Sequence, residues 1–393
     1  MDDGYRVPGM PDGMAAFPGS GGRTILIRNH EVVDSEGPFG PSGPPADLEP
    51  CMFYDYGRGT PATGGTSTIV YDTRQGRVVK QYLSLTGTCR NCAGGPTPWN
   101  SWLSCEENVA LADETWEEDH GYVFEVPASE SIGLVMPVPL KAMGRFNHEA
   151  VAVDSRTGIV YQTEDRNDGC IYRYCPNHPG RLAHGGRLQV LSMADQPSAD
   201  TRNWPNAVQK PYFPIGQPLP VSWIDASDIQ SAQDDLRIRS FQAGAARFAR
   251  GEGMWAGRSA IYFACTTGGA NRAGQIFRYR PSPFEATPGE TSRPGTLELF
   301  LEPNDTRLLK GADNLTTAPW GDVIICEDTG ADNYMVGVTP LGAIYPLARN
   351  VYNSSELCGC CFCPEGQTLF VSIQRPGMTF AIQGPWRKQS CLL

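Results

Sequence analysis

The chain has 393 residues, including 44 glycines and 33 prolines, and a formal net charge of −11. This acidic balance argues against a nucleic-acid partner, because phosphate backbones are bound by clustered Lys and Arg. No apolar run reaches the roughly 20 residues that a membrane span requires, and no export signal opens the chain, so we expect no membrane span.

Short β-rich runs between Gly, Pro and Asp recur along the chain, as in proteins built from many short strands. Six runs end in polar or acidic residues, at 26–31, 102–107, 161–165, 262–267, 324–328 and 370–374. Each is followed by another β-rich run, at 67–72, 121–126, 171–174, 276–279, 334–338 and 378–382. The repeat predicts an all-β fold, a six-bladed β-propeller forming a single domain over 1–393, because radial repetition leaves few exposed sheet edges. A β-sandwich array would also give short strands, but it would not explain the recurring polar ends.

One stretch interrupts the repeat, from about Pro176 to Arg250, where no strand pair is obvious. We expect it to be a loop and short-helix insertion over one face. Near its end, Phe241, Ala245 and Phe248 stand at helical spacing, so a short helix either delivers Arg250 to the centre of the ring or simply packs there.

The polar ends of the repeats form pairs that would meet if the ring closes. The pairs are Asp12 and Glu31, Asn91 and Glu106, Glu149 and Glu164, Glu252 and Thr266, Asn314 and Glu327, and Glu356 and Gln374. Six carboxylates would then approach one axis, namely Glu31, Glu106, Glu149, Glu252, Glu327 and Glu356. Such charges repel by several kcal/mol unless cations neutralise them. Oxygen ligands in that number suit Ca²⁺ or Mg²⁺, whereas any one of these glutamates taken alone is more simply a solvated residue.

Cysteine is frequent, and the total of 13 is odd, so at least one thiol cannot pair within the chain. Cys89 and Cys92 have metal or redox spacing, and four cysteines crowd the segment 358–363. Soft-metal binding and disulfides are open for both groups, but buried reduced cysteines are the simpler interpretation. Cys105 directly precedes Glu106 and would add a thiolate suited to iron or zinc, unless it is a structural core residue.

Arg250 stands two residues before Glu252, so its guanidinium would reach past a metal cluster and clamp a phosphate oxygen. A salt bridge to a neighbouring carboxylate is an equally good explanation. The chain has no Gly-x-Ser-x-Gly, Walker loop, His-Glu-x-x-His or dinucleotide fingerprint, so the common nucleophile and nucleotide sites lack support.

Five motifs together resemble the PhoX-type alkaline phosphatases, and they span nearly the whole chain. They are the segments Asn91–Glu107 (NCAGGPTPWNSWLSCEE), Gly144–Ala150 (GRFNHEA), Arg250–Gly253 (RGEG), Cys326–Asp328 (CED) and Gln374–Gly377 (QRPG). The resemblance implies a six-bladed propeller that holds two Fe³⁺ and three Ca²⁺ ions around a bridging oxo group, with one cysteine thiolate on iron. It also implies a phosphate-ester substrate, a monomer, and a periplasmic or secreted location.

By motif matching, the resemblance assigns the thiolate to Cys105 and further metal ligands to Glu31, Glu149, Glu252, Glu327 and Glu356. Glu106 and Asp328 are second choices, because adjacent strand residues point to opposite sides. Arg250 falls at the catalytic, phosphate-clamping position, and Asn91 is a further candidate for substrate binding. Two other functions stay open on the same architecture: a non-catalytic calcium-binding interaction module, and a calcium-dependent lactonase-like hydrolase.

Overall fold

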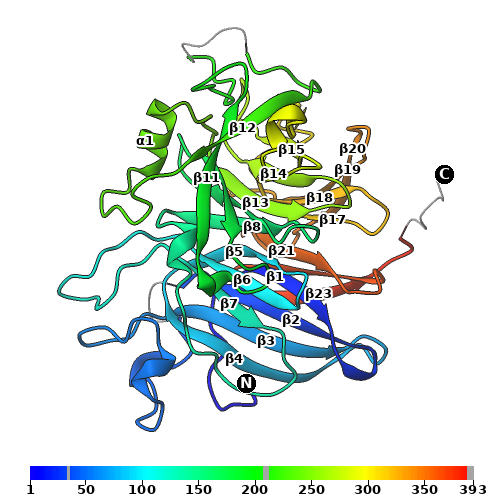
Figure 1. Ribbon diagram of the computed structural model, residues 1–393. Coiled ribbons are helices and arrows are strands. Elements are labelled where there is room, and N and C mark those ends of the chain that lie inside the picture. The colour runs from blue at the N-terminus through cyan, green and yellow to red at the C-terminus, as the bar shows by residue number, and fades with distance from the viewer. Residues whose placement is uncertain (33–35, 207–211, 387–393) are drawn as a thin grey trace.

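The computed structural model describes residues 1–32, 36–206 and 212–386, and it is almost wholly β (Figure 1). The first group of strands comprises β1 (Pro11–Pro18), β2 (Arg23–His30), β3 (Gly64–Asp72) and β4 (Arg77–Thr88). The second comprises β5 (Asn91–Pro96), β6 (Ser101–Glu106) and β7 (Val123–Pro127). The third comprises β8 (His148–Val153), β9 (Val160–Glu164), β10 (Ile171–Pro176), β11 (Gly186–Met193) and β12 (Leu219–Asp225).

The second half of the chain repeats this pattern. The fourth group comprises β13 (Gly251–Ala256), β14 (Ile261–Cys265), β15 (Gln275–Arg280) and β16 (Thr296–Leu301). The fifth comprises β17 (Ala312–Thr317), β18 (Val323–Glu327), β19 (Tyr334–Val338) and β20 (Ile344–Arg349), and the sixth β21 (Leu357–Phe362), β22 (Thr368–Ile373) and β23 (Met378–Gln383). Short 3₁₀ turns lie at Ser20–Gly22, Gly40–Ser42, Pro50–Met52, Lys141–Met143, Leu182–His184 and Glu290–Ser292.

The first strands of the six groups form a closed ring. β1, β5, β8, β13, β17 and β21 each contact the next, and β21 contacts β1. Figure 1 shows the closure, because the blue strands near the N-terminus lie beside the red-orange strands β21 and β23. Within every group, consecutive strands pair antiparallel. The all-β prediction is therefore confirmed, and each of the predicted β-rich runs overlaps a strand.

The groups are not six separate sheets. β12 pairs with both β11 and β16, so the third and fourth groups join into one nine-stranded sheet, and the described residues form five sheets in all. The number of groups is the number of blades that the sequence predicts.

The predicted insertion over 176–250 differs from expectation, because it contains the antiparallel strand pair β11 and β12. β11 completes the third group. The expected helix is also shorter: α1 spans Leu236–Gln242, and it ends before Gly244, whose φ of +112° breaks the helical path. Ala245 and Phe248 lie beyond α1, so the spacing of these residues placed the end of the helix too late in the chain.

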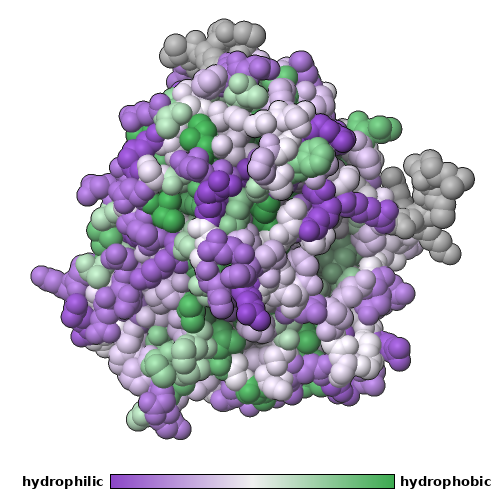
Figure 2. Space-filling view, viewed as in Figure 1, coloured by the Kyte–Doolittle hydropathy of each residue, from purple (hydrophilic) through white to green (hydrophobic). Residues whose placement is uncertain are grey.

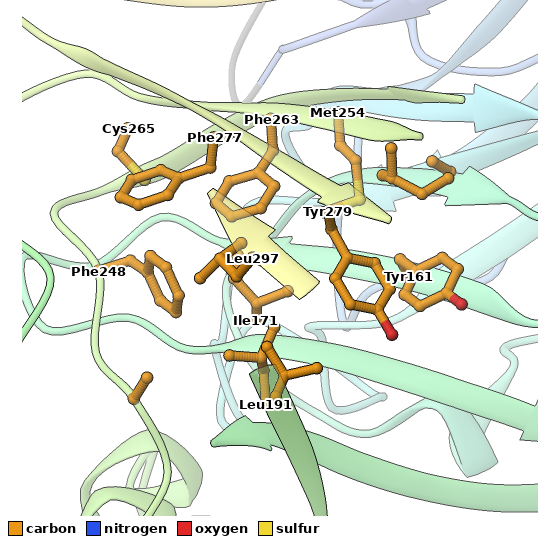
Figure 3. Close-up of a cluster of buried hydrophobic side chains, with 14 of the residues drawn as sticks. Tyr161, Ile171, Leu191, Phe248, Met254, Phe263, Cys265, Phe277, Tyr279 and Leu297 are labelled. Carbon is orange, nitrogen blue, oxygen red and sulfur yellow. The ribbon is translucent and has the colours of Figure 1, made fainter. Parts of the chain in front are cut away.

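An aromatic cluster fixes the segment that leads into β13. Phe248, Phe263 and Phe277 are fully buried, with ring centroids 5.1–5.5 Å apart. Figure 3 shows the three rings gathered with Leu297. Each buried Phe contributes roughly 1.5–3 kcal/mol. This packing anchors the backbone two residues before Arg250.

No helix among the described residues is long and apolar enough to cross a membrane. On the face shown in Figure 2, hydrophobic side chains lie in small patches between hydrophilic ones.

Candidate metal centre

Every first strand of the ring carries a β-bulge near its start. In each of the six groups, two residues of the first strand lie opposite one residue of the second. The first bulged residues are, in chain order, Asp12, Cys92, Glu149, Glu252, Asp313 and Gly359. A bulge re-aims a side chain out of the regular alternation, and bulges are common beside active sites. Five of the six bulges thus present an acid or a thiol.

The second bulged residue is Gly or Ala in four of the six groups, namely Gly13, Ala93, Ala150 and Gly253. A Cβ on Gly13 would lie 2.6 Å from the Cα of Ala93, and a Cβ on Gly253 would lie 2.7 Å from the carbonyl oxygen of Asp313. A side chain at either glycine would push the inner strands apart. In these four groups the sequence pattern is an acid or thiol followed by Gly or Ala.

The ligand atoms of the bulged residues converge with those of four other acids. Four overlapping groups have their carboxylate or thiol atoms within 4.8 Å of one another. We call the nine residues together the acidic cluster; they are Asp12, Glu31, Cys92, Glu107, Glu149, Glu252, Asp313, Asp328 and Glu356. Shared members link each group to the next, so the acidic cluster runs around the ring.

Cys92, and not Cys105, is the thiol in the acidic cluster. Cys92 Sγ lies 3.4 Å from Oδ2 of Asp12 and 3.3 Å from Oε1 of Glu149. Cys105 is the single residue opposite the bulge, and it packs fully buried among hydrophobic side chains such as Leu103 and Val123. The structure therefore places Cys105, which the motifs assign as a metal ligand, on the second strand of the hairpin and outside the acidic cluster.

Three other predicted site residues also lie outside the acidic cluster. Glu106 accepts hydrogen bonds from the backbone N–H groups of Cys89 and Gly121 and contacts His120. Glu327 accepts from the N–H groups of Lys310 and Tyr334. Asn91 bonds Thr88 and Ser104. All three satisfy neighbouring polar groups of the scaffold, whereas Glu31, Glu149, Glu252, Asp328 and Glu356 do lie in the acidic cluster.

At the ends of three second strands, the acid that faces the centre of the ring is one residue later in the chain than the acid that the sequence repeat indicates. Glu106, Glu164 and Glu327 are the last residues of β6, β9 and β18. The side chains that face the centre are those of the next residues, Glu107, Asp165 and Asp328. Alternation along a strand explains this, because a shift of one residue turns a side chain to the other face.

Arg250 and Arg90 both contact the acidic cluster. Arg250 binds Asp165 through Nε at 2.7 Å and Nη2 at 2.8 Å, and its Nη2 lies 2.8 Å from Oε1 of Glu252. Arg90 Nη2 lies 2.5 Å from Oε1 of Glu31 and 2.7 Å from Oε2 of Glu107. The expected salt bridge of Arg250 is thus present, and Arg90 was not foreseen.

Burial raises the pKa of several acids in the acidic cluster, and neighbouring carboxylates add to the effect. The pKa values of Asp12, Glu149 and Glu252 lie well above the ordinary carboxyl value. Burial, and then Asp328, raises the pKa of Asp313 to about 7, and burial raises that of Glu107 to about 8. Bound cations oppose such shifts, because their charge favours the ionised ligands.

The residues present fit metal ions. Oε2 of Glu149 and Oδ1 of Asp313 are buried without a hydrogen-bond partner among the described residues. Buried carboxylate oxygens normally have partners. Eight carboxylates supply the hard oxygen ligands that calcium takes, and one thiol supplies a softer ligand suited to iron.

A cavity of about 650 Å³ lies beside the acidic cluster. Its lining includes Arg6, Met10, Tyr352, Gln374 and Arg375. Gln374 Nε2 also donates to Glu31 at 2.8 Å and to Asp12 at 3.3 Å, so one side chain belongs to both the cavity wall and the acidic cluster.

In a comparison with protein families, the alkaline phosphatase PhoX model matches residues 1–377. The chain belongs to this family. The match covers both halves of the ring and every residue of the acidic cluster, so the resemblance found from the five motifs is confirmed. As a PhoX-family member the protein is a phosphatase by class. No match is found among curated proteins.

Solved structures resemble this PhoX-family chain over most of its length at low identity. The gluconolactonase XC5397 from Xanthomonas campestris gives a TM-score of 0.46 and 11% identity, over 97% of this chain and 88% of its own. A putative 6-phosphogluconolactonase from Bacteroides uniformis gives a TM-score of 0.41 and 10% identity, over 93% of this chain and 80% of its own. A protein from Lactobacillus plantarum gives a TM-score of 0.39 and 11% identity, over 81% of this chain and 77% of its own.

Proposed function

We propose that this protein hydrolyses phosphate monoesters at metal ions held by the acidic cluster. The observation that carries the proposal is the convergence of nine ligand residues at the bulged ends of the ring, in a chain of the PhoX family. So many buried acids in one place favour a metal site, because their mutual repulsion destabilises the fold unless cations are bound.

The proposed cofactors are Fe³⁺ and Ca²⁺. Cys92 would ligate iron, since thiolates are poor calcium ligands, and the carboxylates around it would share iron and calcium. Glu149 lies beside both Cys92 and Glu252 in the overlapping groups, so its two oxygens could serve two ions. When bound, the ions would supply positive charge that stabilises the phosphoryl group as it transfers.

Arg250 would bind and orient the phosphoryl group, as the motif assigns. Its Nε and Nη2 are held by Asp165, and no described residue accepts a hydrogen bond from Nη1. The side chain is 39% exposed. Asp165 therefore fixes the plane of the guanidinium, and Nη1 is left to donate to a phosphate oxygen in a charge-assisted hydrogen bond.

The cavity beside Gln374 is the proposed place of the leaving alcohol. It opens next to Glu31 and Asp12, and it carries the guanidinium of Arg375 and the exposed ring of Tyr352. The guanidinium and the ring would both contact the polar organic part of a phosphate ester. The PhoX resemblance also supports a periplasmic or secreted location and a monomer, which we include in the proposal.

The first test is hydrolysis of an aryl phosphate by the purified protein, with elemental analysis of the same sample. Iron and calcium together with chelator-sensitive turnover would support the proposal. Calcium alone, without phosphatase turnover, would reject the proposal and would favour a non-catalytic calcium-binding interaction module. Turnover of a lactone in place of the phosphate ester would favour the lactonase alternative.

A further inference from the structure

One backbone hydrogen bond recurs in all six groups. The residue directly after the second strand donates its N–H to the carbonyl of the residue directly before the first strand. The donor and acceptor pairs are Glu31 and Met10, Glu107 and Arg90, Asp165 and Asn147, Thr266 and Arg250, Asp328 and Gly311, and Gln374 and Glu356. The repeat therefore defines equivalent positions independently of side-chain chemistry.

Arg90 and Arg250 are equivalent residues by this repeat. Arg90 directly precedes β5, and Arg250 directly precedes β13. Both have left-handed backbone conformations, with φ of +49° and +55°. Met10 and Gly311, at the equivalent positions of two other groups, share this conformation, so the repeat itself holds the two arginines in one backbone geometry.

The two side chains also use the same atoms. Each arginine directs Nε and Nη2 to carboxylates: Arg250 to Asp165 and Glu252, and Arg90 to Glu31 and Glu107. No described residue accepts a hydrogen bond from Nη1 of either arginine. The matched geometry leaves the same pair of N–H groups available in both.

The two guanidinium groups lie on the solvent side of the acids that they contact. Their side chains are 38% and 39% exposed, whereas Glu31, Glu107 and Glu252 are 12%, 11% and 5% exposed. An anion that approaches from solvent therefore meets the guanidinium groups before it meets the carboxylates. Positive charge at this rim offsets the repulsion that the buried acids would exert on a phosphate.

A single residue joins the two arginine sites. Asn147 Nδ2 donates to Oε1 of Glu107 and to the carbonyl of Asp165, both at 3.1 Å. Glu107 binds Arg90, and Asp165 binds Arg250. The arginines thus stand at the two ends of one hydrogen-bonded line along the rim.

We infer that Arg90 is a second substrate-binding arginine, which contacts the same anionic phosphate ester as Arg250 from the opposite end of this line. The inference rests on the proposed phosphatase function, and it adds a residue that the family motifs do not single out. A dianionic phosphoryl group has enough oxygens to accept hydrogen bonds from two guanidinium groups at once. Arg90→Lys would keep the positive charge but lose the planar guanidinium group, which can donate two hydrogen bonds to one anion.

The test measures inhibition by orthophosphate together with KM and kcat for p-nitrophenyl phosphate, in wild type, Arg90→Gln, Arg90→Lys and Arg250→Gln. A charge-assisted hydrogen bond to phosphate is worth about tenfold or more in affinity. We expect Arg90→Gln to raise both the KM and the orthophosphate inhibition constant about tenfold, with a smaller fall in kcat. Arg90→Lys should keep the ion pairs with Glu31 and Glu107 and raise both constants about threefold.

Metal content and melting temperature are measured on every variant, and inhibition constants are compared only between metal-loaded variants, because a residue with a merely structural role would then leave the phosphate inhibition constant unchanged. Arg156→Gln is the matched control, since Arg156 pairs with Asp154 at the far end of β8 and should behave as wild type. If Arg90→Gln does not fold or binds no metal, the inference is tested on the KM and the orthophosphate inhibition constant of Arg90→Lys. An inhibition constant within error of wild type in a metal-loaded Arg90 variant would overturn the inference. Metal-loaded wild type without phosphatase turnover would instead reject the proposed function.

Discussion

Sγ of Cys92 lies 3.3 Å from Oε1 of Glu149, although the two residues stand on neighbouring strands of the ring and 57 positions apart in the chain. Both are first residues of a β-bulge. The same thiol reaches Asp12 on the other side. Three consecutive first strands therefore place their ligand atoms against one another, which is what a shared metal site requires.

Removing the Cys92 thiol should remove metal and activity together. We expect Cys92→Ala to lower turnover of an aryl phosphate about 100-fold or more, with a matching loss of iron. Cys105→Ala is the matched control. It should keep its metal and its turnover within about threefold, and lose about 1–2 kcal/mol of unfolding free energy because it leaves a small apolar cavity. Equal metal loss in both variants would show that the two thiols have been assigned incorrectly.

Glu149→Gln and Glu106→Gln should fail in different ways. Glu149 has a buried oxygen without a partner among the described residues, so Glu149→Gln removes a ligand charge and should lower metal content and turnover, with little loss of stability when both proteins are compared without metal. Glu106 accepts hydrogen bonds from scaffold groups, so Glu106→Gln should cost about 1.5–3 kcal/mol of unfolding free energy and keep the metal. Elemental analysis and denaturant unfolding separate the two. Metal loss in Glu106→Gln alone would contradict the assignment.

The bulges should be sensitive to any added side chain. A Cβ on Gly253 would lie 2.7 Å from the carbonyl oxygen of Asp313, so Gly253→Ala should cost about 1–3 kcal/mol and displace the neighbouring ligand Glu252. Gly133→Ala is the control, because nothing lies within 4 Å of the added Cβ. Thermal unfolding and metal content are the measurements. A fully stable, metal-loaded Gly253→Ala protein would show that the inner strands can move apart.

His120 should make part of the stability depend on pH. Its Nδ1 lies 2.7 Å from Glu106 and its Nε2 3.2 Å from Asp55. Burial lowers the pKa of His120, but the two carboxylates more than offset it, so the pKa is raised above 6.5. The stabilisation is therefore fully present below the unfolded pKa of about 6.5 and is lost as pH rises through the raised folded pKa.

The measurement is the unfolding free energy of wild type and His120→Gln between about pH 6 and pH 9. The difference between the two proteins should shrink as pH rises. A difference that stays constant or grows with pH would contradict the assigned charge of His120.

The strands and the ring could be predicted from the sequence because the hairpin repeat is strong. The six runs with polar ends and the six runs that follow them all overlap strands. Missing from that prediction was the pairing of β12 with β16, a contact between groups that a repeat within groups cannot indicate.

The site could be predicted only in part. Glu31, Glu149, Glu252 and Glu356 stand in the acidic cluster, as their positions in the repeat indicated. Cys92 was considered only as part of the Cys89 and Cys92 pair, and its place among the carboxylates was not predicted, because regular alternation fails at a bulge, where one added residue changes the face of the strand. A recurring acid or thiol before a small residue was the available signal for it. Asp313, at the fifth bulge, precedes Asn314 and so lacks this signal.

The central claim is that phosphatase activity depends on metal bound by the bulged residues of the ring. The most direct measurement follows turnover of p-nitrophenyl phosphate and metal content on one sample, during removal by chelator and return of iron and calcium. We predict that wild type loses turnover in step with metal and regains both, and that Cys92→Ala regains neither. Undiminished turnover in fully metal-depleted protein would contradict the claim.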